Sequence, residues 1–189
     1  MVKSMSKVVV ALGANLTLRG NGPKVTLAQA LEVMEAKGLV IRAKSRLFST
    51  PCFPAGAGPD YVNAAAVIET ELDPRGVLDL LHEVEAEFGR ARVQRWGMRT
   101  LDLDLVCWDD RVLPDLDGYR RWLDLPMEQQ VQSAPEQLIV PHPRLQDRAF
   151  VLVPMADVAP DWRHPVLDLT VREMIGQLPA DEVAAVTPL

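Results

Sequence analysis

The tract from Leu101 to Leu105 alternates leucine with aspartate, and this alternation restricts the fold of the chain more than any other feature. In a β-strand, successive side chains point to opposite faces of the sheet. The three leucines are therefore predicted to lie on a buried face, while Asp102 and Asp104 share the other face, roughly 7 Å apart along the strand. Two carboxylates held this close repel each other unless a cation lies between them. The tract predicts a strand that binds a metal ion.

Arginines precede this pair of acids. Between Gly89 and Thr100 the chain has four arginines and no acidic residue. Guanidinium groups offer planar, paired hydrogen-bond donors that suit phosphate. Magnesium typically takes one or two carboxylates together with substrate phosphates. The arginines and the acids together indicate a site for a metal–nucleotide complex, although two acids alone also occur on ordinary solvated strands.

Composition excludes several classes of protein. A chain of 189 residues with 48% hydrophobic residues is expected to fold as one domain over residues 1–189. Its net charge of −6 argues against nucleic-acid binding, and the apolar run Val8–Leu12 is too short for a membrane span or a signal peptide. Cys52 and Cys107 do not make a disulfide framework. We expect a cytoplasmic monomer with small-molecule partners.

The hydrophobic pattern predicts an α+β fold with a ferredoxin-like order of elements, in which helices cover one face of an antiparallel sheet. Asp73 and Pro74 are a typical helix start, because a capping carboxylate precedes a proline at the first helical position. A polar insert is predicted at about 109–137. The other predicted elements are strands at 7–12, 39–50, 61–72 and 150–155, helices at 23–37, 74–88 and 169–178, and the strand with the two acids.

Eight segments in order carry a resemblance to a known family. The most specific is Arg95–Asp104, and the others are Ala11–Leu16, Ser49–Pro51, Pro59–Ala65, Gly89–Arg92, Val140–Pro143, Asp147–Phe150 and Asp157–Pro160. With them the chain resembles the 6-hydroxymethyl-7,8-dihydropterin pyrophosphokinases over roughly residues 8–165. The resemblance implies transfer of pyrophosphate from MgATP to the hydroxymethyl group of the pterin, with release of AMP. It also implies a three-layer α/β/α arrangement around the sheet.

The same resemblance implies roles for individual residues. Asp102 and Asp104 match the ligands of two magnesium ions, and Arg92 and Arg99 match phosphate-binding catalytic arginines. Further ATP contacts are implied for His82, Glu85, Arg90, His142 and Arg148, with Glu85 on the polar flank of its helix. Pterin contacts are implied for Thr50, Pro51, Phe53, Tyr61, Asn63, Trp96 and Phe150.

Two other functions remain open from the sequence. One is a different magnesium-dependent nucleotidyl or phosphoryl transferase that uses the same paired acids. The other is a ligand-binding protein that keeps the fold and has lost turnover. The insert at 109–137 is longer than the connection usual in the family, and a lid, an interaction surface or a flexible decoration are all compatible with its sequence.

Overall fold

A computed structural model of the chain describes residues 5–52, 56, 58–89, 99–132 and 135–189. Across these residues, six strands form one sheet in the spatial order β5–β1–β4–β3–β6, with β2 also paired to β4. All five strand pairings are antiparallel, which confirms the predicted type of sheet. The strands are β1 (Ser6–Ala14), β2 (Val40–Lys44), β3 (Phe48–Thr50), β4 (Tyr61–Thr70), β5 (Asp102–Trp108) and β6 (Thr187–Pro188).

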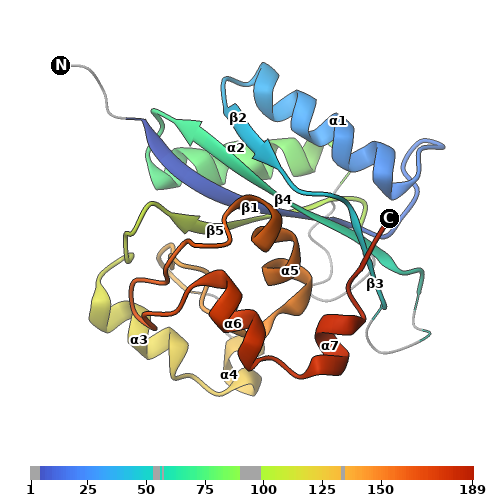
Figure 1. The fold of residues 1–189 in the computed structure, drawn as a ribbon. Helices are drawn as coiled ribbons and strands as arrows, with labels where there is room; N and C mark the ends of the chain where they lie inside the picture. Colours follow the sequence, from blue (N-terminus) through green and yellow to red (C-terminus); the bar gives the residue numbers. More distant parts are fainter. Residues whose placement is uncertain (1–4, 53–55, 57, 90–98, 133–134) are drawn as a thin grey trace.

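Helices cover both faces of this sheet (Figure 1). The three-layer arrangement implied by the resemblance is therefore confirmed, and the expectation from the hydrophobic pattern that helices cover one face alone is wrong. The helices α1 (Pro23–Ala36) and α2 (Pro74–Glu87) form one outer layer. The opposite layer contains α3 (Leu116–Leu123), α4 (Met127–Gln132), the 3-10 helix η1 (Leu145–Asp147), α5 (Ala149–Val158), α6 (Val171–Gln177) and α7 (Ala180–Ala184). No helix in the described part of the chain is long and apolar enough to cross a membrane.

Alternation along the strands divides the apolar residues between two cores. Val8, Val10 and Leu12 of β1 point toward α1 and α2 and belong to the larger core. Val9 and, in part, Ala11 point the other way and pack with residues of α5 and α6. The centre of the sheet therefore has no solvated face.

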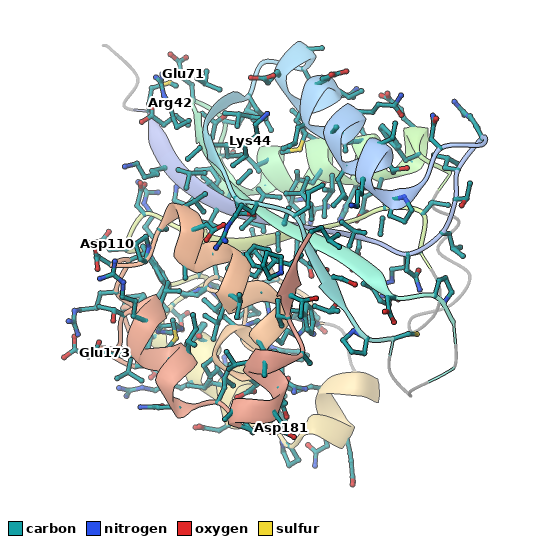
Figure 2. All side chains as sticks on the ribbon, turned by 45° about the vertical axis from the view of Figure 1, so that its right-hand side comes forward. Arg42, Lys44, Glu71, Asp110, Glu173 and Asp181 are labelled. Carbon is teal, nitrogen blue, oxygen red and sulfur yellow. The ribbon has the colours of Figure 1, made fainter. Side chains whose placement is uncertain are left out.

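The strand β2 carries charged side chains where it pairs with β4. Arg42 Nε lies 2.7 Å from Glu69 Oε2 of β4, and Lys44 follows on the same strand. Figure 2 shows Arg42 and Lys44 at this border of the molecule. Charged edge strands resist pairing with a second chain. This arrangement is compatible with a monomer, which stays a prediction.

The predicted strand at 150–155 is wrong. Residues 149–158 form α5, even though the segment contains a Val-Leu-Val run and Pro154. The buried residues Val151, Leu152 and Met155 recur at helical spacing and pack on the sheet face that carries Val9. Burial against that face outweighs the strand preference of the valines.

The predicted single strand at 39–50 is divided into β2 and β3. Between them, the backbone N–H of Ser45 donates to Ala65 O at 2.8 Å, and the Ser45 hydroxyl accepts from Ala65 N at 2.9 Å. The last predicted helix is present as α6, which begins with a capping box between Thr170 and Glu173. The short α7 and β6 were not predicted, because five and two residues carry too little periodicity to detect.

The insert at 109–137 is anchored to the C-terminal part of the chain by a buried polar contact. Tyr119 of α3 and His164 are both fully buried, and the Tyr119 hydroxyl lies 2.9 Å from His164 Nε2. His164 Nδ1 accepts from the backbone N–H groups of Val166 and Leu167. These hydrogen bonds assign the imidazole proton to Nε2, which donates to the tyrosine oxygen. Through this contact α3 packs as part of the domain.

Burial lowers the pKa of His164 from 6.5 to about 4. The unfolded chain therefore binds this proton at a higher pH than the folded chain does. The contribution of the neutral His164 to the free energy of unfolding is therefore complete above pH 6.5 and is lost as the pH decreases toward 4. Over this range the histidine contributes a slope of up to about 1.4 kcal/mol per pH unit.

We expect His164→Gln to reduce this dependence. Urea unfolding between pH 7.5 and 4.5 should give a shallower loss of stability for the variant than for the unmodified chain, although the variant starts from a lower stability at pH 7.5. His142 and the carboxylates titrate in both proteins and so cancel in the comparison. Equal slopes would contradict the assignment of a buried neutral His164.

Candidate active site

The alternation predicted for β5 is present in the structure. Leu101, Leu103 and Leu105 are buried toward α1 and α2, whereas Asp102 and Asp104 are half-buried on the opposite face. That opposite face is the one that α5 covers. The two acids therefore lie next to each other on one face of β5, near the N-terminal end of the strand.

Strand register brings these acids close to the strands with the predicted pterin residues. Gly13 of β1 lies opposite Asp102 of β5 on one side and opposite Asn63 of β4 on the other. Neighbouring strands are about 4.8 Å apart, so the backbones of Asp102 and Asn63 are about 10 Å apart. In the next row, Ala11 lies between Asp104 and Ala65. Small residues thus form the floor between the acids and Asn63.

Arginines neutralise both acids. Arg99 Nη1 forms an ion pair with Asp102 Oδ2, and Arg148 Nη1 lies 3.8 Å from Asp104 Oδ2. Burial lowers the pKa of Arg148, Asp104 opposes this shift, and Arg144 adds to it. Arg99 also lowers the pKa of Arg148, so the charges of Arg144 and Arg99 both repel the charge of Arg148. Mutual repulsion among them favours binding of an anion.

His142 joins this cluster as a neutral side chain. Its pKa is lowered to about 3, mainly by burial and then by Arg148 and Arg144, against an opposing effect of Asp102. Its backbone N–H donates to Val106 O of β5 at 2.7 Å, and its Nδ1 accepts from Arg144 N at 3.1 Å. Because Nδ1 is used as an acceptor, the proton is assigned to Nε2. The imidazole is therefore available as a donor to an anion at neutral pH.

A second polar group lies across β1, on β3 and β4. Asn63 Nδ2 donates to Thr50 Oγ1 at 2.6 Å, and both side chains are buried. This hydrogen bond fixes the Asn63 carboxamide and directs Oδ1 toward Gly13. Tyr61, opposite Thr50 in the register, has a pKa raised by burial, with smaller effects of Arg99, Cys52 and Asp102. Tyr61 thus connects the Thr50 side of the site with the acids.

Phe150 and Pro51 are exposed on the margins of this region. Phe150 is the second residue of α5 and is 42% exposed, with the Arg148 guanidinium carbon 5.6 Å from its ring centre. A large exposed aromatic ring beside a cluster of charged groups is available to stack on a ligand. Packing in the core, the alternative explanation for this residue, is excluded by its exposure.

Glu85 corrects one detail of the sequence interpretation. It does not lie on the polar flank of α2: its side chain is 1% exposed, and Oε1 accepts from the backbone N–H of Leu103 at 2.7 Å. The carboxylate therefore attaches α2 to the strand between the two acids. His82, one turn earlier on α2, is half-buried. A nucleotide contact for either residue stays a prediction.

Four predicted site residues lie outside the described part of the chain. They are Phe53, Arg90, Arg92 and Trp96. The structure brings together most of the others around the shared face of β5, β1, β4 and β3: Thr50, Tyr61, Asn63, Arg99, Asp102, Asp104, His142 and Arg148.

Sequence reasoning missed three residues that support the site. Gly13 has no room for a side chain, because a Cβ atom would lie 2.9 Å from Asn63 Oδ1. Arg144 holds His142 through its backbone N–H. Asn15, which is 2% exposed, bonds to the backbones of Pro59 and Arg99. The Gly13-Ala14-Asn15 segment gave a turn signal, but its partners are 44 to 84 residues away in the chain.

Two carboxylates are a suitable set for a metal that arrives with a substrate. Within the described residues, no group of three or more histidine, cysteine or acidic side chains could hold a metal ion alone. Magnesium commonly binds one or two carboxylates and completes its coordination with water and substrate phosphates. Asp102 and Asp104 fit this mode, and the adjacent arginines and His142 would face the phosphates.

The antiparallel three-layer fold, the paired acids and the neighbouring arginines suit the class of transferases whose substrate carries a polyphosphate. Within this class, residues 9–160 match the family model described as 7,8-dihydro-6-hydroxymethylpterin-pyrophosphokinase, and the chain belongs to this family. A Synechocystis 2-amino-4-hydroxy-6-hydroxymethyldihydropteridine pyrophosphokinase is 34% identical over 95% of this chain and 80% of its own length. A Pseudomonas aeruginosa protein of the same name is 37% identical over 85% of both chains.

Solved structures agree on the fold. A Plasmodium falciparum HPPK-DHPS crystal structure superposes with a TM-score of 0.66 over 93% of this chain, at 16% sequence identity. The present chain spans 46% of that longer chain. At this low identity the similarity supports the architecture alone. The segments that lie in the described residues therefore occur on the fold that their resemblance implied.

Proposed function

We propose that Asp102 and Asp104 hold two magnesium ions of MgATP during the reaction of the chain, an ATP-dependent pyrophosphokinase of folate biosynthesis. The substrate that receives the pyrophosphate is 6-hydroxymethyl-7,8-dihydropterin. Its hydroxymethyl oxygen attacks the β-phosphorus, the bond to the α-phosphate breaks, and AMP leaves. The single observation that supports this proposal is the row of Asp102, Gly13 and Asn63 on one sheet face, in which the proposed metal ligand Asp102 and the proposed pterin-binding residue Asn63 lie on the two strands that flank β1.

Exchange of ion-pair partners explains how the nucleotide is accepted. In the structure, Asp102 pairs with Arg99 and Asp104 with Arg148. A metal–polyphosphate complex would offer each group a substitute: Asp102 and Asp104 would hold the metal, and Arg99 and Arg148 would pair with the phosphates. When bound, the metal neutralises phosphate charge and aligns the nucleophile with the leaving group.

The remaining residues bind and orient. His142 donates from Nε2 to a phosphate oxygen, and its low pKa keeps it neutral in this role. The Asn63 carboxamide pairs with the amide edge of the pterin through Oδ1. The hydrogen bond from Nδ2 to Thr50 directs this Oδ1 toward Gly13. Phe150 stacks on the flat ring. Arg90, Arg92 and Trp96 complete the proposed phosphate and pterin contacts.

The proposal is tested by following AMP while the protein is incubated with MgATP and 6-hydroxymethyl-7,8-dihydropterin. AMP formation that depends on the pterin supports it. AMP formed equally well without pterin would indicate a different transferase. Nucleotide binding without any AMP would indicate a binding protein that has lost turnover.

The metal role predicts a large loss of turnover for Asp102→Asn and Asp104→Asn. Each change should reduce kcat by at least about a hundredfold, because removal of one placed charge in an active site commonly has an effect of this size. Asp110→Asn is the matched control, since this exposed acid lies just beyond the opposite end of β5, and its side chain points outward in Figure 2. Near-normal turnover of either site variant would contradict the metal assignment.

The pterin role predicts a selective effect for Thr50→Val. The change keeps the shape of the side chain and removes the hydroxyl that holds Asn63. The KM for the pterin should increase about three- to tenfold, the effect of one hydrogen bond, while the KM for MgATP stays unchanged. Ser49→Ala, on the opposite face of β3, is the control. Equal changes in both KM values would contradict this role.

A further inference from the structure

Asn15 connects two segments that flank the active site, and it does so from a buried position. It follows β1 directly, and it is 2% exposed. Its side chain has two bonding groups, and the structure gives each a different partner. Oδ1 accepts from the backbone N–H of Arg99 at 2.8 Å, and Nδ2 donates to the carbonyl of Pro59 at 3.1 Å.

The backbone of Arg99 is held by further hydrogen bonds. Besides the side-chain bond, the backbone N–H groups of Asn15 and Leu16 donate to Arg99 O at 3.0 and 3.2 Å. Both polar backbone groups of Arg99 are thus bonded to the end of β1. Since the Arg99 guanidinium pairs with Asp102, these bonds set where the cation meets the metal-binding strand.

The Pro59 side leads to the pterin residues. Pro59 stands two residues before Tyr61, with which β4 begins, and it ends the proline- and glycine-rich segment that starts after Thr50. One carboxamide therefore touches the segment that enters β4 and the segment that enters β5. Asparagine suits this position because its side chain has both a donor and an acceptor, whereas aspartate lacks the donor and serine lacks the reach to both partners.

We propose that Asn15 is a positioning residue that couples binding of the pterin to binding of the nucleotide. It contacts neither substrate. It ties the backbone before the pterin strand to the backbone before the metal strand, so a shift of one segment on binding is transmitted to the other. Coupling of this kind is reciprocal: each ligand tightens the other by the same factor. This inference rests on the proposed function, because it assumes that the two segments serve the two substrates.

The test compares Asn15→Ala, Asn15→Asp and a control, Thr26→Ala. Asn15→Ala removes both bonds, whereas Asn15→Asp keeps the acceptor for Arg99 and replaces the donor to Pro59 with an oxygen. Thr26 is fully buried in the first turn of α1, where its hydroxyl donates to Gly22 O. The control therefore loses a buried hydrogen bond that involves neither Pro59 nor Arg99.

Calorimetry measures the coupling directly. The dissociation constant of 6-hydroxymethylpterin is determined with and without magnesium α,β-methylene-ATP, in which the bond that breaks in the reaction is blocked. In the unmodified chain the nucleotide should lower the dissociation constant of the pterin by at least about fivefold. In both Asn15 variants the ratio of the two pterin dissociation constants should approach one. Each ligand alone should still bind within about threefold of its normal dissociation constant, and kcat should decrease at least about tenfold. Thr26→Ala should keep the ratio of the unmodified chain.

Three results would overturn the proposal: no coupling in the unmodified chain, full coupling in either Asn15 variant, or an equal loss in Thr26→Ala. Urea unfolding of all four proteins separates coupling from general instability. Failure of the proposed function has a different signature, since the unmodified chain would then form no pterin-dependent AMP. If AMP forms normally and the coupling factor is insensitive to Asn15, only the inference about Asn15 is wrong.

Discussion

Antiparallel hydrogen bonding holds β1 between β5 and β4, with Gly13 opposite Asp102 on one side and Asn63 on the other. Everything proposed for the site depends on this register. A slip of one residue would turn Asp102 and Asp104 into the core beneath α2 and would expose the leucines. The apolar pattern of β1 prevents such a slip, because Val8, Val10 and Leu12 belong to one core and Val9 to the other.

Charge pairing is the second constraint on the site. Arg99 and Arg148 pair with the two acids of β5, and Glu85 holds the backbone between those acids from the other face of the sheet. Because the arginines compensate the acids, the folded chain tolerates two half-buried carboxylates near each other. The contacts that pair these acids and arginines in the folded chain are also those proposed to receive MgATP.

Local patterns predicted the parts of this protein that depend on local rules. The Leu-Asp alternation predicted β5 and its two faces, and Asp73 with Pro74 predicted the start of α2, where Asp73 accepts from Gly76 N. The errors arose where distant packing decides. Residues 150–155 read as a strand but form a helix because they bury against the sheet, and Glu85 looked exposed because its partner Leu103 lies 18 residues away. Asn15 was missed for the same reason.

The distance between the bound metal and the bound pterin tests whether one sheet face presents the metal ligands and the pterin-binding residues to each other across β1. Paramagnetic relaxation of the protons of 6-hydroxymethylpterin can be measured in the complex with Mn²⁺ and α,β-methylene-ATP. Two strand spacings separate Asp102 from Asn63, so we expect a distance of about 10 Å or less between the metal and the pterin. A distance beyond about 20 Å, more than four strand spacings, would contradict it.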